Sequence, residues 1–593
     1  MDGNYRLTEA GVKTPRARPC HVPNVASREA DPLAAVPPAR TYATGMAPDL
    51  VHAGHRVPLV PGQTLFDAAD ELELVVPASC RRSGRCHECI VEIITGGEAL
   101  VPPGVEESFL RPGYRLACRA AVARDDAGIE FAVLRRRLRI FMPPDGPPLE
   151  VDPAVQVIDG RVRLLADQGT PIDDLGSAHG RLLGLALDVG TTTVVLELVD
   201  LASGEALAAA AFENPQRFGG SDVMARITYD DEHPGELRRA LRHALNHELT
   251  RLYAAWNVDR HQVAEVVVVG NATMRDLAFG LDVAPIGRSP YRSTSEVAWR
   301  AGEAASTAVE RRAHELGFLV HPRARVWGAP LIACHVGADA AADLVAMDGE
   351  AAGVPRMLVD VGTNTEVILT DGERTLACSC PAGPAFEGGL IRYGMPGAEG
   401  AIESVRSVGG AFVVRTIGDV DPEGICGSGL VDLLAELRRT GAMDPRGVFA
   451  NGGTAVAVVP HRGITLSRAD ASHLAQAKAA NAVGMQVLLR MLGLEAADLA
   501  RLDLAGGFAS SLDVPNAIAI GFLPAVLPER VVRHGNASVR GAKALLLSRG
   551  ARARLEARVA RIEHVELEAE PDFFELFVDG CRFEPLSAAG TPA

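Results

Sequence analysis

The sequence predicts a multidomain α/β protein in which a small cysteine-bearing domain precedes a larger module with two similar lobes. Three observations lead to this prediction. Four cysteines lie among short strand-like runs between Cys80 and Cys118. Two strand–turn–strand segments, which begin at Leu185 and Met357, share the residues Asp-Val-Gly-Thr where their first strand ends. From Gly184 onward, apolar β-branched runs alternate with helical patterns, as is typical of a sheet covered by helices.

Composition and charge restrict the class of protein. The 593 residues correspond to about three or four domains. The chain is 47% hydrophobic, but no apolar run approaches the ~20 residues of a membrane span, so we expect a soluble protein without a membrane partner. The formal net charge of −16 argues against a nucleic-acid partner, because neutralising phosphates requires a basic face. No stretch resembles an export signal, so the ten cysteines indicate a cytoplasmic location and metal–thiolate chemistry.

Residues 1–48 are predicted to form a disordered tail. They are rich in proline, arginine and alanine and show no hydrophobic periodicity. Met46 lies just before the first structured segment and is an alternative start of the protein.

Residues 49–134 are predicted to form the cysteine-bearing domain. Residues 55–60 have a strand pattern, and Thr64 is the expected N-cap of a helix over residues 65–72. The cysteines follow the pattern Cys-x5-Cys-x2-Cys, with a fourth after a strand and a loop: Cys80, Cys86, Cys89 and Cys118. Four thiolates in this arrangement suit a [2Fe–2S] cluster, and Gly84 would let the loop fold around it and direct N–H groups at sulfur. A structural zinc site is the alternative.

Residues 135–182 are predicted to be a linker and a reduced middle region. The arginines within residues 135–139 are interpreted as a solvated edge of the preceding domain. The proline run from Pro143 to Pro148 is interpreted as a semi-rigid spacer. Only weak strand signals follow, over residues 155–165.

Residues 183–593 are predicted to form two lobes that clamp a polyphosphate between the two strand–turn–strand segments. Glycine lets backbone N–H groups approach phosphate oxygens, threonine and asparagine donate hydrogen bonds, and an aspartate holds Mg²⁺ directly or through water. As hydrophilic turn residues, the two aspartates should contribute less than about 1 kcal/mol to folding. Ordinary Asp-x-Gly turns are the alternative interpretation. The candidates are Asp188, Gly190, Thr191 and Thr192 in the first segment, and Asp360, Gly362, Thr363 and Asn364 in the second.

Further positions at strand ends are candidates for the same cleft. Gly506 and Gly507 follow an apolar strand and are the best additional nucleotide-binding candidates. Asn271 and Thr273 follow a continuous valine run, and ligands of open α/β sheets gather at such strand ends.

Other glycine-rich stretches cover residues 383–389 and 424–429. The second precedes a helical pattern and suits either an anion at a helix N-terminus or a tight turn. Lys478 lies on a predicted helix before the glycine pair. A solvated position is its simpler interpretation, and a contact with adenine or ribose is the alternative.

The two Asp-Val-Gly-Thr segments resemble the phosphate-1 and phosphate-2 motifs of the ATPase superfamily that includes acetate kinase, sugar kinases, heat-shock chaperones and actin. The stretch from Leu504 to Ala509 resembles the adenosine motif of that superfamily. The cysteine spacing is similar to that of the adrenodoxin-like branch of the ferredoxins. These resemblances imply a β-grasp ferredoxin-like domain followed by a two-lobed ATPase of the actin, heat-shock chaperone and sugar kinase type.

Joined in one chain, the two halves resemble the reductive activators of corrinoid proteins over nearly everything after residue 48. This resemblance implies a [2Fe–2S] cluster, ATP and Mg²⁺ as cofactors. It implies an ATP-driven one-electron reduction of an inactive Co(II) corrinoid to Co(I), with Asp188 and Asp360 as the catalytic residues. A corrinoid protein or cobalamin-dependent methyltransferase and an electron donor, a reductase or a ferredoxin, would be the partners. The oligomeric state stays open, with a homodimer as one option.

Two departures from the family pattern stand out. Ala509 occupies a position where relatives often carry another glycine, and the segment before residue 183 is short for a middle domain. Two other functions also remain: a redox-regulated small-molecule kinase, and an electron-transfer component of an oxygenase or dehydrogenase. A kinase needs a base for its substrate hydroxyl, and the sequence offers no clear candidate.

Overall fold

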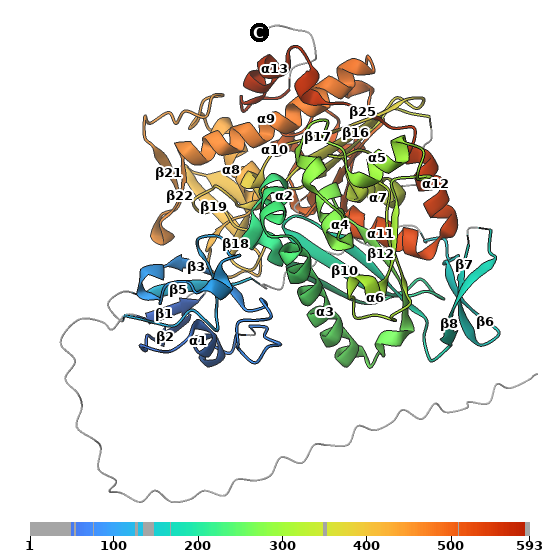
Figure 1. The fold of residues 1–593 in the computed structure, drawn as a ribbon. Coiled ribbons are helices and arrows are strands. Elements are labelled where there is room, and N and C mark those ends of the chain that lie inside the picture. The colour runs from blue at the N-terminus through green and yellow to red at the C-terminus, as the bar shows by residue number, and fades with distance from the viewer. Residues whose placement is uncertain are drawn as a thin grey trace, which may run out of the picture. The chain divides into compact units, whose positions relative to one another are not determined.

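The structure is a computed structural model, drawn as a ribbon in Figure 1. It describes residues 49–586 except for residues 53–54, 75, 125–127, 135–147, 167, 348–352 and 508. The predicted tail over residues 1–48, the arginines at 135–139 and most of the proline spacer lie outside the described residues.

The cysteine-bearing domain is a five-stranded sheet with the strand order β2-β1-β5-β3-β4. Its strands are β1 (Asp49–His52), β2 (His55–Pro58), β3 (Ile90–Thr95), β4 (Tyr114–Leu116) and β5 (Ile129–Val133). Strands β1 and β5 are parallel, and the other pairs are antiparallel. Helix α1 (Leu65–Glu71) begins after Thr64, which forms a capping box with Asp67. The predicted ferredoxin-like fold is confirmed.

A three-stranded antiparallel sheet follows, formed by β6 (Val155–Ile158), β7 (Arg161–Leu165) and β8 (Pro171–Ser177). The weak strand signals covered only its first two strands. Strand β8 escaped detection because its sequence, Pro-Ile-Asp-Asp-Leu-Gly-Ser, lacks the apolar alternation of a half-buried strand. The guanidinium of Arg549 donates to the carboxylate of Asp152 at 2.9 Å and fixes the segment before this sheet to helix α12 (Arg549–Val559).

The two lobes contain sheets in which five of the six strands have the same arrangement. The sixth strand is β13, antiparallel to β14, in the first lobe and β25, parallel to β17, in the second. In the first lobe the order is β11-β10-β9-β12-β14-β13, and in the second it is β24-β23-β15-β16-β17-β25. In each, three consecutive antiparallel strands are extended by parallel strands that pair with the first of the three. The strands are β9 (Leu183–Val189), β10 (Thr193–Asp200), β11 (Ala206–Glu213), β12 (Val263–Val269), β13 (Val309–Arg312), β14 (Arg325–Gly328), β15 (Arg356–Val361), β16 (Thr365–Thr370), β17 (Thr375–Cys380), β23 (Arg501–Ala505), β24 (Val531–Gly535) and β25 (Glu563–His564). The predicted two-lobed ATPase fold is confirmed.

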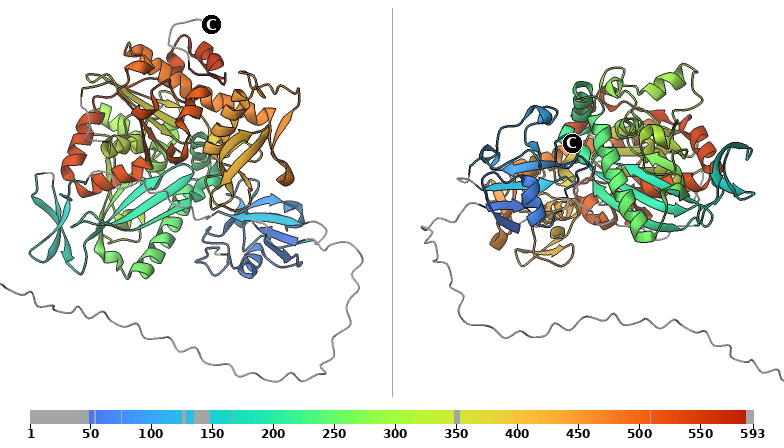
Figure 2. Two further views of the ribbon diagram at one scale, coloured as in Figure 1. Left: turned by 180° about the vertical axis from the view of Figure 1, so that it is seen from behind. Right: turned by 60° about the horizontal axis from the view of Figure 1, so that its bottom comes forward.

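Helices cover both faces of the first-lobe sheet, so all seven residues of β9 and of β12 are buried. Helix α3 lies on one face and α11 on the other (Figure 2). The first-lobe helices are α2 (Val223–Glu232), α3 (Glu236–Trp256), α4 (Ala272–Phe279), α5 (Thr294–Arg300), α6 (Ala313–Leu316) and α7 (Ala338–Ala346).

The second lobe carries an inserted region between β17 and β23, with two small sheets and two long helices. Its elements are β18 (Ala401–Val408), β19 (Ala411–Thr416), β20 (Gly424–Ile425), α8 (Gly427–Arg439), β21 (Ala455–Val459), β22 (Ile464–Ser467) and α9 (Arg468–Met491). The remaining helices are α10 (Val514–Ala519), α11 (Ala537–Leu547) and α13 (Phe573–Gly580).

Helices α7 and α11 pack tightly against each other, although α7 follows the last strands of the first lobe and α11 follows β24 of the second. At their closest approach, a Cβ atom on Gly541 would lie 2.0 Å from the carbonyl oxygen of Ala342. Only glycine fits at this position. The pair therefore links the two lobes at their base.

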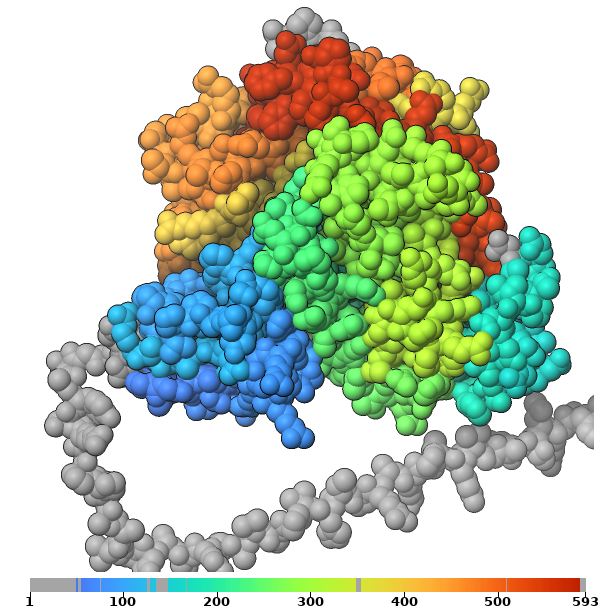
Figure 3. All heavy atoms as spheres, in the orientation of Figure 1, coloured from blue at the N-terminus to red at the C-terminus, as the bar shows by residue number. Residues whose placement is uncertain are grey.

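The cysteine-bearing domain contacts helices α2 and α3 of the first lobe. The hydroxyl of Tyr229 donates to the carbonyl of Phe109, and Nδ1 of His243 lies 2.7 Å from Oε1 of Glu88. In the space-filling view, the blue atoms of the domain adjoin the green atoms of these helices (Figure 3). Within the described part of the chain, none of the helices is long and apolar enough to cross a membrane.

Candidate functional site

The cysteine loop carries three of the four predicted ligands, and the fourth follows β4. Cys80, Cys86 and Cys89 lie between α1 and β3, and Cys118 lies two residues after the end of β4. The sulfur atoms of Cys89 and Cys118 are 3.4 Å apart and both side chains are buried, whereas Cys80 and Cys86 are half-buried. Among the described residues, no three His, Cys, Asp or Glu side chains converge as the ligands of one metal ion would.

The loop backbone is bent so that its N–H groups reach sulfur. Arg81, Arg82 and His87 have positive φ angles of 52°, 63° and 58°. Gly84, with φ at 78°, packs so closely that a Cβ atom there would lie 2.6 Å from Nε of Arg119. Strained backbone of this kind persists where the surrounding structure holds it.

Hydrogen bonds favour the thiolate form of two cysteines. Burial opposes ionisation of Cys80, but the Ser83 hydroxyl and the backbone N–H groups of Cys86 and Arg85 outweigh it and lower its pKa to about 6. The hydrogen bond with Cys89 lowers the pKa of Cys118 to about 7, against the effect of burial and with a further contribution from the Gly84 backbone. The hydrogen bond with Cys118, together with burial, raises the pKa of Cys89. Metal-bound cysteine is a thiolate, so the N–H donors around Cys80 and Cys118 suit two ligands of an iron–sulfur cluster.

All ten predicted nucleotide-binding residues line a single cavity of about 290 Å³. The first turn connects β9 to β10, and the N–H of Gly190 donates to the carbonyl of Thr193 at 2.9 Å. The second turn connects β15 to β16 in the same way, through the N–H of Gly362 and the carbonyl of Asn364 at 3.1 Å. The cavity is lined by Asp188, Gly190, Thr191, Thr192, Asp360, Gly362, Thr363, Asn364, Gly506 and Gly507, together with other residues.

The two aspartates do not lie in the turns. Asp188 is in β9 and Asp360 is in β15, each one residue before the end of its strand. Asp188 is buried, with 8% of its surface exposed, and Asp360 is half-buried. The expectation that both are hydrophilic turn residues is therefore wrong, since each lies in its strand and Asp188 is buried. The Asp-x-Gly pattern is compatible with either position, and the sheet decides that the strand extends through the aspartate.

Further carboxyl groups that the sequence analysis did not single out surround these aspartates. Asp339 on α7 lines the cavity, as does Glu366 on β16. Removal from bulk water, and then the charges of Asp339 and Asp360, hold the pKa of Asp188 well above its usual range. Burial and the charge of Asp360 raise the pKa of Asp339 to about 7. Carboxyls crowded in this way favour a divalent cation, which would relieve their mutual repulsion.

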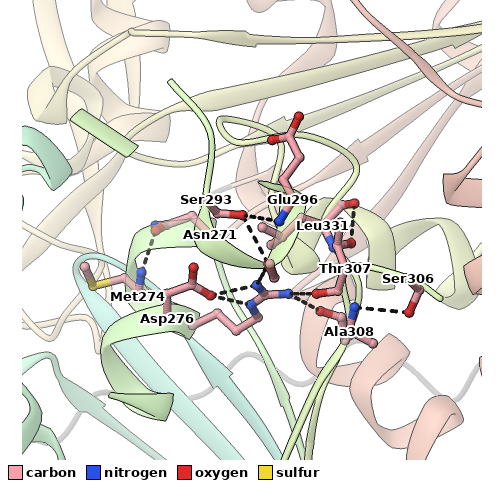
Figure 4. A network of polar contacts seen from close by, with 12 residues as sticks. Asn271, Met274, Asp276, Ser293, Glu296, Ser306, Thr307, Ala308 and Leu331 are labelled. Atoms are coloured by element: carbon pink, nitrogen blue, oxygen red, sulfur yellow. Dashed lines mark hydrogen bonds and ion pairs between the residues drawn. The ribbon is translucent and has the colours of Figure 1, made fainter. Parts of the chain in front are cut away.

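The end of the valine run also reaches the cavity. Asn271 caps α4 by accepting the N–H of Met274 at 3.0 Å, while its amide donates to Oγ1 of Thr191 at 2.9 Å. A buried network holds this helix: Arg275 pairs with Asp276 at 2.7 Å and donates to the carbonyl of Thr307 at 2.9 Å (Figure 4). Asn271 thus lies where the sequence analysis predicted. Thr273 is buried but is not among the lining residues.

Two other candidates have different outcomes. Lys478 is fully buried and does not line the cavity; its Nζ atom lies 3.4 Å from the carbonyl of Gly521. The interpretation of Lys478 as a solvated lysine is therefore wrong, and the nucleotide contact has no support from the cavity lining. The glycine-rich stretch at residues 383–389 instead supplies Glu387, which lines the cavity and accepts hydrogen bonds from Thr192 and Thr363 of the two turns. A lone glutamate between glycines carried no sequence signal for this role.

The fold and these two sites define a two-lobed protein of the actin and sugar kinase class that is joined to a ferredoxin-type iron–sulfur domain. The chain is 30% identical over 429 residues to the corrinoid activation enzyme RamQ of Eubacterium limosum, a match that covers 68% of this chain and 70% of that protein. The chain belongs to the family of corrinoid activation enzymes that RamQ represents.

Other comparisons agree. The family models described as the C-terminal domain of RACo (the ASKHA domain), the RACo middle region and the 2Fe-2S iron-sulfur cluster binding domain match residues 355–589, 183–350 and 51–123. The middle-region match thus covers the first lobe, whereas the reduced middle region was predicted within residues 135–182. A Co(II) methylated amine-specific corrinoid protein reductase of Methanosarcina barkeri is 24% identical over 403 residues, covering 62% of this chain and 70% of that protein.

A solved structure of a reductive activator for corrinoid, iron-sulfur protein has 26% sequence identity and a TM-score of 0.65. The match covers 91% of this chain and 99% of that one. The whole described architecture, cluster domain and both lobes, therefore recurs in a protein of this family.

Proposed function

We propose that this protein is an ATP-dependent reductive activator of a corrinoid protein, which returns an inactive Co(II) corrinoid to Co(I) by one-electron transfer. The observation that carries the proposal is the presence, in one chain of this family, of a four-cysteine ferredoxin loop and a cavity at which both phosphate-binding turns meet. The location is cytoplasmic, because the cysteines need a reducing compartment to remain thiols.

Cys80, Cys86, Cys89 and Cys118 would hold the [2Fe–2S] cluster, which supplies one-electron transfer when bound. The N–H groups that lower the thiol pKa of Cys80 and Cys118 would donate to the cluster sulfurs and set the reduction potential. The half-buried Cys80 and Cys86 form the side of the site nearer to solvent, where an external electron donor has access.

Asp188 and Asp360 would hold Mg²⁺ through its water shell. Asp339, which lines the same cavity, would add a third carboxyl group. Mg²⁺ usually keeps several waters and binds one or two carboxylates plus substrate phosphates, which suits carboxyls that surround a cavity without converging on one point. Backbone N–H groups at Gly190 and Gly362 and the side chains of the turns would bind the phosphates. The remaining predicted contacts are Thr191, Thr192, Thr363 and Asn364 for phosphate, and Gly506 and Gly507 for adenosine.

The coupling has a simple energetic requirement. Each ~100 mV of uphill one-electron transfer costs about 2.3 kcal/mol. Binding of Mg·ATP across both lobes would favour a closed arrangement of this protein. The corrinoid partner would bind that closed form in a state in which its cobalt is easier to reduce. The binding energy of the nucleotide would then supply the cost of the electron transfer.

The test is a cobalt spectrum. The purified protein, a chemical reductant and a corrinoid methyltransferase are mixed anaerobically, with and without Mg·ATP. We expect the cluster to be reduced in both mixtures and Co(I) to form only with Mg·ATP. Equal rates of Co(I) formation with and without nucleotide would reject the coupling, and a lack of Co(I) with every corrinoid partner would favour a kinase or an oxygenase component.

A further inference from the structure

We propose that Glu387 is a catalytic residue of ATP hydrolysis, which orients the attacking water between the two phosphate-binding turns and accepts its proton. The inference rests on the proposed function, because it requires the cavity to bind Mg·ATP. It assigns a chemical role to the glycine-rich stretch at residues 383–389, which the nucleotide-binding motifs leave unexplained.

The carboxylate of Glu387 lies where the two turns meet. Oε2 of Glu387 accepts a hydrogen bond from Oγ1 of Thr192 at 3.0 Å and another from Oγ1 of Thr363. The two hydroxyl oxygens are themselves 3.1 Å apart. Thr192 belongs to the turn of the first lobe and Thr363 to the turn of the second, so one carboxylate lies where both turns meet. A terminal phosphate held by the two turns would lie within one water molecule of this carboxylate.

The backbone around Glu387 fixes the position of its side chain. A short 3₁₀ helix, Pro384–Glu387, is bounded by Gly383 at φ 72° and Gly388 at φ 92°. A Cβ atom on Gly388 would lie 2.4 Å from the backbone nitrogen of Met395, so only glycine fits there. Phe386 packs edge-on against Phe522 with ring centroids 5.0 Å apart. The carboxylate is therefore held on an element that cannot easily move away.

The charged and polar groups that face Glu387 shift the pKa of its carboxyl group. Removal from bulk water raises its pKa, hydrogen bonds from Thr363 and Thr192 and the charge of Arg226 on α2 lower it, and the charge of Asp360 raises it. The net direction is upward. Arg226 is buried and donates to the carbonyl of Gly220, so its positive charge remains close to the carboxylate. A carboxyl with a raised pKa is a better proton acceptor near neutral pH than an ordinary glutamate.

The chemical step balances without another reactant. The water oxygen bonds to the γ-phosphorus, and the bond from that phosphorus to the β–γ bridging oxygen breaks, leaving ADP and phosphate. The water proton moves to the Glu387 carboxylate and from there to the released phosphate. Phosphoryl transfer depends mainly on positioning and electrostatics, so loss of this carboxylate should slow turnover by about 10²–10³-fold.

The experiment compares Glu387→Gln with Glu436→Gln in the full-length, cluster-loaded protein. The amide keeps the shape and accepts the threonine hydrogen bonds but takes no proton. We expect the ATPase rate of Glu387→Gln to fall by about 10²–10³-fold, the dissociation constant for Mg·ATP to change less than about threefold, and the acidic limb of the pH–rate profile to shift to that set by the other carboxyls of the cavity. Glu436 is a matched control, a buried glutamate on α8 that accepts the N–H of Ser407 and does not line the cavity. Its variant should hydrolyse ATP at the wild-type rate.

Glu387→Asp is the control for a folding defect. It retains a carboxylate, so we expect it to recover part of the activity that Glu387→Gln loses. Hydrolysis by Glu387→Gln within about threefold of wild type would overturn the proposal, as would equal losses of affinity and turnover, which indicate a binding role.

The role of Glu387 and the proposed function of the protein can fail separately. If Glu387→Gln hydrolyses ATP normally while Co(I) formation still needs Mg·ATP, only the role of Glu387 is wrong. If the variant loses hydrolysis but no corrinoid is reduced by the wild type, only the proposed function is wrong.

Discussion

Near the cysteine loop, hydrogen bonds lower the pKa of two of the four predicted cluster ligands, whereas in the cavity between the two turns burial and neighbouring carboxyl groups raise the pKa of the aspartates. The pKa of Cys80 falls to about 6 because N–H and O–H donors outweigh burial, and Arg81, Arg82 and Arg85 lie in the same loop. The pKa of Asp339 rises to about 7 because burial and the charge of Asp360 act together. The first site therefore favours ionisation of two thiols, and the second opposes ionisation of its carboxyl groups.

The difference indicates what each site requires. Because Cys80 and Cys118 are stabilised as thiolates by neighbouring donors, we expect the cluster site to depend chiefly on the cysteine loop and the residues next to it. Crowded carboxyls in the cavity destabilise the folded protein until a cation binds, so the lobes should depend on Mg²⁺ with nucleotide. Four predictions follow from this contrast.

Replacement of a cluster ligand should have the largest effect, and only on one site. Cys86→Ser removes a thiolate, so iron and sulfide content and the visible absorbance of the purified protein should fall almost to zero. Binding of Mg·ATP should change little, because the cavity is built from other elements. Cys581→Ser is the control and should retain the cluster. If anaerobically prepared wild type contains zinc and no sulfide, the iron–sulfur assignment is wrong.

Neutralising an aspartate in the cavity should abolish activity and stabilise the fold. Asp188→Asn and Asp360→Asn keep the side-chain shape but remove charge that Mg²⁺ needs, so ATP turnover should fall by at least about 100-fold. Without nucleotide, each variant should be more stable than wild type by about 1 kcal/mol, since a crowded carboxylate is lost. ATPase assays and denaturant unfolding check both parts. Wild-type hydrolysis by both variants would mean that the repeat is only a shared turn.

Stability without nucleotide should fall as pH rises through the range in which Asp339 ionises. Its folded pKa, about 7, lies above the ordinary value of 3.8, so the folded state holds more protons between these values and loses stability as pH increases from about 4 to about 7. Mg·ADP should therefore raise the melting temperature more at pH 8 than at pH 6. Asp339→Asn should flatten the pH dependence relative to wild type. An unchanged slope in that variant would contradict the titration of Asp339.

The smallest effect is expected at Lys478. Burial lowers its pKa to about 8, and the residue is not among those that line the cavity. Lys478→Met should leave the dissociation constant for Mg·ATP within about twofold of wild type, because most substitutions away from a site are neutral to binding. Isothermal titration measures this directly. A loss of tenfold or more would return Lys478 to the nucleotide site.

Much of both sites was predictable because their chemistry is local. Three of the predicted cluster ligands occur within one loop, and each predicted phosphate-binding turn lies within a single strand–turn–strand segment, so spacing alone singled them out. Strand patterns located most of the sheets, and the repeat of Asp-Val-Gly-Thr predicted two similar lobes, which the matching strand orders confirm. Strand β8 was missed because its polar sequence has no periodic signal.

The sequence by itself determined which residue types stand at the strand ends and in the cysteine loop, and hence the fold class and the main candidates. Only the tertiary structure decided which distant segments meet. Glu387 contacts Thr192 across 195 residues of chain, and Asp339 joins Asp188 and Asp360 through helix α7. The depth of Asp188 in its sheet was also decided by packing. The physical reason is that burial, mutual repulsion and hydrogen bonding depend on neighbours in space, which no local pattern specifies.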